Sequence, residues 1–157
     1  MATSPEERIV ELNLALPAPP KPGAIYKPVV VVDRLVFVSG IVSLNGDGSA
    51  ATGKVGRDLN TEQGQCAARQ TALNMLSILR AQLGSLNRVK RLVKTLGMVN
   101  CLPEFQECAS VINGFSQLMA DVFGNEDGIG ARSAVGATLP LNFAVEVEDI
   151  FELHEPL

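Results

Sequence analysis

The chain is poor in aromatic residues and contains no tryptophan: aromatic residues make up 4% of its 157 positions. We therefore expect a hydrophobic core built mainly from aliphatic side chains. The same scarcity removes the stacking platforms on which single-stranded nucleic acids bind. Because the net charge is −4, the surface is also unfavourable for a phosphate backbone. The composition argues against a nucleic-acid partner.

Histidine and cysteine are also rare. The only histidine, His154, lies three residues from the C-terminus, where side chains are usually exposed and mobile, and it leaves no good Ser-His or Cys-His pair. Three cysteines, Cys66, Cys101 and Cys108, are an odd number, which is typical of reduced thiols rather than of a disulfide framework. No cluster has the spacing of zinc ligands, so we expect no metal.

No segment has the apolar length needed to span a bilayer, and the first residues are acidic where a targeting peptide would be basic. We therefore expect a cytosolic protein that does not bind membranes. A chain of this length is predicted to form one domain, which would bury about 70% of the surface of the unfolded chain.

Residues 128–153 combine charge with strand periodicity more densely than any other part of the chain. From residue 143 onward the side chains alternate between two faces. One face carries Phe143, Val145, Val147, Phe151 and Leu153, and the other carries Ala144, Glu146, Glu148, Ile150 and Glu152. Asp149 interrupts the apolar face, so a bend or bulge is expected there. Residues 132–137 predict another strand, and 138–142 a turn, because Pro140 cannot donate to a central ladder.

The glutamates of this strand have two interpretations. Glutamates that alternate with valines are typical of the solvated face of a half-buried strand. Alternatively, Glu146 and Glu148 lie about 6.6 Å apart on one face, and a partner subunit covering that face would raise at least one carboxyl pKa, as a general acid or base requires. Arg132 would then be the natural clamp for an anion, since its planar guanidinium can bind a carboxylate through two bonds.

The first forty residues divide into three segments. Residues 8–13 predict an edge strand. Residues 16–23 contain four prolines, which fix φ and remove donors, so an extended arm across the surface is expected. The β-branched runs 27–32 and 35–39 are separated by two residues, a spacing that predicts a hairpin. Gly40, directly after it, would let a ligand or a second backbone approach closely.

Residues 48–55 read GSAATGKV and come close to a phosphate-binding loop. Val55 stands where that motif needs the Ser or Thr that holds magnesium, and the segment follows a turn rather than a strand. The residues after it also do not continue as a helix. We therefore predict an ordinary glycine-rich loop.

Two amphipathic helices and a long strand fill the middle of the chain. The first helix begins at Asn60 or Thr61, which can cap it, and ends at Gly84. Residues 89–99 predict a strand whose basic cluster, Arg88, Lys90, Arg91 and Lys94, indicates a solvated face. The second helix is predicted to begin at Pro103 and end at Gly124, with the polar Asn113 at the edge of its apolar stripe.

This order of elements predicts an α+β fold in which two helices cover one face of a mixed sheet. The single domain would span residues 1–157, with an N-terminal strand and proline-rich arm in 1–23 and the core in 24–157. Hydrophobic residues make up 46% of the chain and the mean hydropathy is +0.21. These values favour a partner, meaning a homo-oligomer, on the other sheet face.

Across residues 16–153 the chain resembles the RidA/YjgF family of reactive-intermediate deaminases, also labelled L-PSP endoribonucleases. The positions that carry the resemblance are Tyr26, Ser39-Gly40, Asn113, Arg132-Ser133, Leu139-Pro140 and Val145-Glu146-Val147-Glu148. The resemblance implies a chorismate-mutase-like fold assembled as a homotrimer, with clefts between subunits. It also implies hydrolysis of small enamines and imines, such as 2-aminoacrylate, to a 2-keto acid and ammonia, with no metal or organic cofactor.

Roles carry over by position. Arg132 would grip the substrate carboxylate, and Glu146 would lie near the attacking water. The pocket would be lined by Tyr26, Ser39, Gly40 and Asn113. The chain departs from the family pattern at Ala134, where a cysteine is common, in a longer segment 105–113, and in a shorter loop between Arg132 and Glu146. A non-catalytic trimeric binder of small carboxylates, or an endoribonuclease, are the alternative functions.

Overall fold

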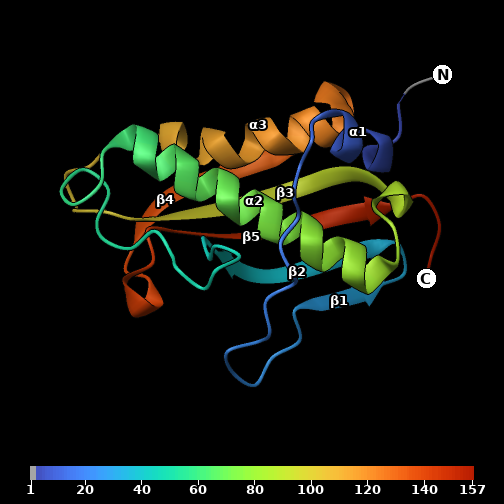
Figure 1. Cartoon of the computed structure of the whole chain (residues 1–157), viewed down its shortest axis with the longest axis horizontal. Helices are drawn as coiled ribbons and strands as arrows, with labels where there is room; N and C mark the ends of the chain where they lie inside the picture. Colours follow the sequence, from blue (N-terminus) through green and yellow to red (C-terminus); the bar gives the residue numbers. More distant parts are fainter. Residues whose placement is uncertain (1–2) are drawn as a thin grey trace.

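The computed structural model describes residues 3–157 and shows one mixed sheet with its long helices on one face (Figure 1). Its strands are β1 (Val29–Val32), β2 (Leu35–Val42), β3 (Val89–Asn100), β4 (Ala131–Ala137) and β5 (Val145–Leu153). The helices are α1 (Pro5–Glu11), α2 (Thr61–Leu83) and α3 (Cys108–Asp127). Helices α2 and α3 pack on each other and on the sheet, and α1 packs beside α3. The predicted α+β class is confirmed.

The strand order across the sheet is β1-β2-β5-β3-β4, which places the glutamate-bearing β5 in the centre. All neighbouring strands pair antiparallel except β3 and β4, which are parallel. Parallel neighbours need a long crossover, and α3 supplies it between β3 and β4. The hairpin predicted from the two valine-rich runs is formed by β1 and β2.

Sequence signals place the two long helices well, but both boundaries of the second helix differ from the prediction. Asn60 and Gln63 form a reciprocal capping box at the start of α2, and Gly84 ends it with a φ of 83°. The prediction that the second helix begins at Pro103 is wrong, because α3 begins at Cys108. Gly124 interrupts α3 with a φ of 85°, but the helix resumes and reaches Asp127.

The predicted N-terminal strand over residues 8–13 is wrong: the chain forms α1 there. Ser4 accepts a hydrogen bond from the Glu7 N–H while the Glu7 carboxylate accepts one from the Ser4 N–H. This capping box, with Pro5 in the first turn, favours a helix. It outweighs the short alternation of polar and apolar residues in 8–13 that predicted a strand. The carboxylate of Glu6 in α1 also accepts a hydrogen bond from the Leu86 N–H at 2.9 Å.

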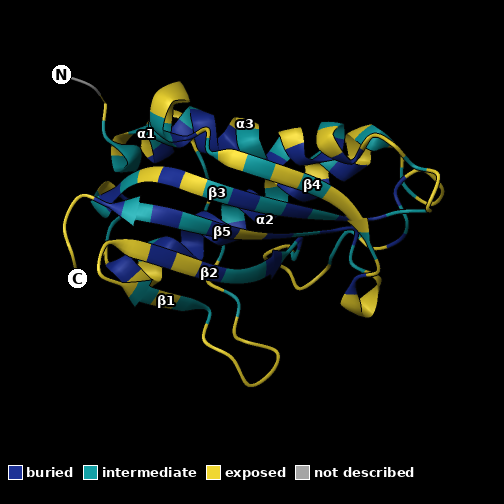
Figure 2. Ribbon diagram, turned by 180° about the vertical axis from the view of Figure 1, so that it is seen from behind, coloured by how far each residue is buried: buried dark blue, intermediate teal, exposed yellow. Residues whose placement is uncertain are grey.

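The two faces of the sheet differ in what covers them. On the helix side, Val36, Val99, Val147 and Phe151 are fully buried against α2 and α3. The opposite face is uncovered in the single chain and shows bands of exposed residues (Figure 2). Its exposed apolar side chains are Val30, Val32, Leu35, Phe37, Val93 and Val135. Within residues 3–157, none of the helices combines the length and apolar character that crossing a bilayer requires.

The irregularity expected in β5 at Asp149 lies instead in the neighbouring strand. Val38 of β2 is opposite Asp149, and Ile41 is opposite Val147, so β2 has one residue more than β5 over this stretch. The bulge therefore falls at Ser39 and Gly40. A bulge redirects nearby side chains, and this one lies beside Glu146.

Candidate functional site

A cavity of about 580 Å³ opens beside the end of β2. Four of the residues singled out from the sequence line it together: Tyr26, Ser39, Gly40 and Glu146. The proline-rich arm forms one wall, and the short 3-10 helix η2 (Pro140–Asn142) forms another. Its volume falls within the range of small-molecule sites.

Gly40 makes room for the carboxylate of Glu146. A Cβ at this position would overlap that carboxylate and would come within 2.9 Å of its Cδ. The Glu146 side chain is thus held against the backbone of the bulge and is half-buried. Burial raises the pKa of Glu146 above its ordinary value, and the nearby charge of Glu148 raises it further. A raised pKa makes a carboxyl group a better proton acceptor and donor for catalysis than an ordinary surface glutamate.

The bulge also fixes the segment that follows the proline-rich arm. The Ser39 hydroxyl donates to the carbonyl of Lys27 at 2.7 Å, and the Ser39 N–H donates to the carbonyl of Pro28 at 2.9 Å. These bonds anchor the segment that carries Tyr26, whose side chain remains 46% exposed. Ser39 therefore acts on the shape of the cavity through the backbone.

Arg132 lies in a second cluster, at the sheet edge formed by β4. One guanidinium nitrogen, Nη1, donates to Asn113 Oδ1 at 2.9 Å and to Ser116 Oγ at 3.0 Å, and Nη2 donates to the carbonyl of Ala109 at 3.3 Å. All three acceptors belong to α3. Arginine has five N–H donors, so the Nε–H and one N–H of Nη2 have no partner among residues 3–157.

The structure does not bring Arg132 and Glu146 together within one chain. Arg132 is opposite Thr95 of β3, which is buried beneath the helices, whereas Glu146 is opposite Met98. Because neighbouring strand residues point to opposite faces, Thr95 and Met98 leave different sides of the sheet. Arg132 and Asn113 thus form one cluster on the helix side, and Tyr26, Ser39, Gly40 and Glu146 form another around the cavity.

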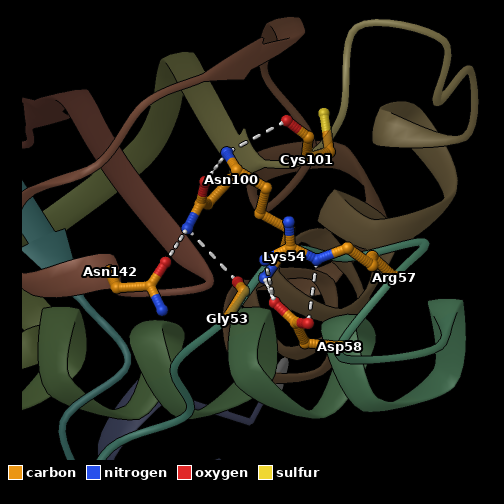
Figure 3. A network of polar contacts seen from close by, with 7 residues as sticks. All are labelled: Gly53, Lys54, Arg57, Asp58, Asn100, Cys101 and Asn142. Atoms are coloured by element: carbon orange, nitrogen blue, oxygen red, sulfur yellow. Dashed lines mark hydrogen bonds and ion pairs between the residues drawn. The ribbon is translucent and has the colours of Figure 1, made fainter.

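A polar network that the sequence analysis missed holds η2 in place (Figure 3). The amide of Asn100 at the end of β3, which is 2% exposed, donates to Asn142 Oδ1 at 2.9 Å and to the Gly53 carbonyl at 3.3 Å. Lys54 Nζ donates to Asn100 Oδ1 at 2.8 Å. The segment that resembled a phosphate-binding loop therefore has a structural contact for its lysine.

This network supports an unusual backbone. Leu141 and Asn142 have φ values of 51° and 58°, a conformation that few residues other than glycine adopt. The turn places Pro140 and Leu141 in the wall of the cavity. The Leu-Pro turn could be read from the sequence, but its dependence on a buried asparagine forty residues earlier could not.

Two other acidic residues of β5 have different surroundings. Asp149 is 3% exposed, and neither of its carboxyl oxygens has a hydrogen-bond partner among residues 3–157. Burial raises the pKa of Asp149 to about 8; the neighbouring Thr95 hydroxyl acts in the opposite direction, and the charge of Glu148 adds to the rise. Glu152 instead contacts three basic side chains, Lys90, Arg91 and Arg34. Its hydrogen bond from Lys90 is the main reason that its pKa is lowered.

The structure described for residues 3–157 contains no group of three or more His, Cys, Asp or Glu side chains that could hold a metal ion. Much of the predicted basic cluster is occupied by the contacts of Lys90 and Arg91 with Glu152. Lys94 Nζ donates to Ser133 Oγ at 2.9 Å. These contacts fit the interpretation of the cluster as a solvated strand face.

Comparison with known proteins identifies the family. The sequence profile described as "YjgF/chorismate mutase-like, putative endoribonuclease" matches residues 6–153. The chain is 44% identical to Protein TCP17 of Trypanosoma cruzi over 144 residues. The aligned region covers 91% of this chain and 90% of that protein.

Solved structures agree with this assignment. The chain is similar to the Agrobacterium tumefaciens protein Atu1372, whose function is unknown, at 40% identity and a TM-score of 0.85 over 95% of this chain and 93% of that one. It is also similar to a "putative endoribonuclease" of Shewanella oneidensis at 28% identity and a TM-score of 0.90, over 96% and 99% of the two chains. The fold, the cavity beside Glu146 and these matches agree: the chain belongs to the YjgF/chorismate mutase-like family.

Proposed function

We propose that this protein hydrolyses small 2-imino acids and their enamine tautomers to 2-keto acids and ammonia, at a site completed by a second copy of the chain. The observation that carries this proposal is the pair of complementary clusters. One offers a half-buried carboxyl group in a cavity, and the other offers an arginine held by α3 with donors to spare. Neither cluster alone has both the anion clamp and the base.

Hydrolysis of an imino acid requires mainly a donor group that binds the carboxylate and a base that activates water. Within the described part of the chain, Arg132 keeps its Nε–H and one Nη2–H without a partner, and guanidinium donors of this kind can bind a carboxylate through two bonds. Glu146 accepts a proton from a water molecule, which attacks the electrophilic carbon of the imine. The same carboxyl group returns this proton to the imine nitrogen, which gives a carbinolamine. It then carries the hydroxyl proton of the carbinolamine to the amine nitrogen, so that the C–N bond breaks, ammonia leaves, and the new carbonyl group is that of a 2-keto acid.

The uncovered sheet face supports a homotrimer with its clefts between subunits. Apolar side chains such as Val30, Val32 and Phe37 are exposed on this face, and contiguous apolar surface of this kind is typical of a protein interface. A neighbouring subunit on this face would cover the side on which Glu146 lies. If its own β4 edge approached the cavity, its Arg132 would complete the site.

A coupled assay tests the proposed reaction. An amino-acid oxidase generates imino acids in the presence of semicarbazide, and the fall in semicarbazone formation measures their hydrolysis. We expect the wild type to suppress the semicarbazone and Arg132→Ala to lose this effect. The half-buried Arg88 supplies the matched control, since Arg88→Ala removes the same charge away from both clusters. Equal activity of wild type and Arg132→Ala would contradict the proposal.

A non-catalytic binder of carboxylate metabolites is the second candidate, and the size of the cavity favours it. A cavity of about 580 Å³ exceeds what 2-aminoacrylate needs, so the site could retain larger 2-keto acids. Calorimetry with a series of 2-keto acids would reveal binding, and absent turnover over several imino acids would then assign the protein to this class.

A further inference from the structure

Two of the three cysteines lie in contact at the junction between the sheet and α3. Cys101 directly follows β3, and Cys108 is the first residue of α3. Their Sγ atoms are 3.8 Å apart, and both thiols are free in this structure. The third cysteine, Cys66, is exposed on α2 and lines a separate groove.

The two sulfur atoms are in contact but not at bonding distance. A disulfide requires about 2.0 Å between sulfurs, so the Sγ atoms would have to approach by about 1.8 Å. The connecting residues 102–107 belong to neither a helix nor a strand. A movement of this size can therefore be shared between the loop and the first turn of α3.

The two thiols have unequal environments. Cys108 is 8% exposed, and burial, together with its hydrogen bond to Cys101, raises its thiol pKa to about 11. Cys108 is therefore protonated at neutral pH. Cys101 is only half-buried, so it is the thiol that an oxidant reaches first, and Cys108 is placed to resolve the product.

We propose that Cys101 and Cys108 form a redox-responsive dithiol, a modification site at which a hydroperoxide produces an intramolecular disulfide, and that this bond shifts the residues holding Arg132. The Cys101 thiolate attacks the terminal peroxide oxygen, the O–O bond breaks, and a sulfenic acid and one hydroxide (or alkoxide) result. The Cys108 thiol then attacks the Cys101 sulfur and expels the sulfenic oxygen as water. Two thiols are oxidised, and one hydroperoxide is reduced.

The dithiol lies next to the anchors of both clusters. Ala109, which follows Cys108, accepts the hydrogen bond from Arg132 Nη2, and Asn113 and Ser116 lie further along the same helix. On the other side, Lys54 Nζ contacts both Asn100 Oδ1 and, at 3.4 Å, the carbonyl of Cys101 (Figure 3). A displacement of Cys108 toward Cys101 therefore acts first on the acceptors of Arg132.

Mass spectrometry of the full chain tests the bond. Cys66→Ser removes the exposed thiol and serves as the background. After treatment with hydrogen peroxide and alkylation of free thiols, we expect a loss of two hydrogen atoms and no alkylation. Cleavage after Glu104 separates the two cysteines, so the disulfide should join the two resulting peptides until dithiothreitol is added. A sulfinic acid on Cys101 beside an alkylated Cys108 would overturn the proposal.

Two variants and one further measurement make the coupling testable without any enzymatic assay. Cys101→Ser should leave the Cys108 thiol reduced under the same treatment, and Cys108→Ala should stop at a sulfenic acid on Cys101 that dimedone traps. Hydrogen–deuterium exchange of residues 108–116 should change on oxidation of the Cys66→Ser protein but not of the protein that also carries Cys101→Ser. Unchanged exchange in a fully oxidised sample would refute the link to Arg132, whatever the catalytic activity.

Discussion

The Glu146 cluster and the Arg132 cluster are built by opposite means. The position of Glu146 depends on the room left at Gly40, which lacks the Cβ that would overlap the Glu146 carboxylate. Burial raises the pKa of Glu146. Arg132 is placed by bonds to three oxygen acceptors on α3. A carboxyl group that must exchange protons benefits from losing water, whereas a guanidinium keeps its charge and needs orientation. Each cluster thus holds its functional group in a defined position, but the two clusters lie apart within one chain.

The largest effect is expected on catalytic activity, when two variants that are each inactive are mixed. Arg132→Ala should cost about 2–5 kcal/mol of substrate binding, and Glu146→Gln should lower the rate by about 10²–10⁴-fold. If the two clusters meet between subunits, unfolding and refolding the two variants together should restore about a quarter of the wild-type activity, since random assembly of a cyclic oligomer pairs an intact Arg132 with an intact Glu146 at that frequency. The semicarbazide assay measures the recovery.

The matched control mixes Arg132→Ala with the double variant Arg132→Ala/Glu146→Gln. No interface of that mixture contains Arg132, so no activity should return. Absence of recovery in the first mixture as well, with assembly shown by light scattering, would mean that the clusters act separately or that the proposed reaction is wrong.

Gly114→Ala should destabilise the contact between α2 and α3, the helix that holds Arg132. A Cβ at Gly114 would lie 2.8 Å from the carbonyl carbon of Gln65 in α2, so α2 and α3 would have to separate. Forcing extra volume into a packed contact costs about 1–3 kcal/mol of unfolding free energy. Urea denaturation measures this loss, and Gly23→Ala, where the added Cβ meets nothing within 4 Å, is the control. Equal stability of the two variants would show that this crossing is not tight.

Much of the fold could be predicted because its signals are local. The capping box of α2, the alternation in β5 and the two-residue hairpin each depend on residues near in sequence. The predicted N-terminal strand is wrong for the same reason: the alternation in residues 8–13 is short, and the capping box of Ser4 and Glu7 beside it starts a helix.

The candidate site was predicted only in part, because its geometry depends on contacts across the chain. The residue types and the cavity-lining set around Glu146 could be named from motif positions. The separation of Arg132 from Glu146 could not, since it follows from strand register. Nor could the support of Asn142 by the buried Asn100, because a lone asparagine at a strand end has no sequence signature.

Asp149, a buried carboxyl group in β5, makes the stability of the fold depend on pH. It lies opposite Val38, next to the bulge, and opposite Thr95, which is itself opposite Arg132. Because its folded pKa of about 8 exceeds the unfolded value, the unfolded chain releases this proton at lower pH. Its contribution to stability is therefore complete below about pH 4 and is lost as pH rises toward about 8, by at most about 1.4 kcal/mol per pH unit.

Asp149→Asn should remove this slope and stabilise the protein at neutral and alkaline pH. Urea denaturation at pH 5, 7 and 9 would show it, with Glu126→Gln, which changes an exposed carboxyl group on α3, as the control. A decline that persists unchanged in Asp149→Asn would assign the slope to another group.

Gly40→Ala should have the smallest effect on stability and the most specific effect on Glu146. The new Cβ meets the far end of a flexible side chain, which can swing toward solvent, so the loss of unfolding free energy should stay below about 1 kcal/mol. Once the carboxyl group is hydrated, the cause of its raised pKa is removed, because burial is the larger contribution. The acidic limb of the pH–rate profile should therefore move to lower pH in Gly40→Ala, while the affinity for 2-keto acids, set by Arg132, stays close to that of the wild type. A limb that does not move would mean that another group, and not Glu146, titrates during turnover.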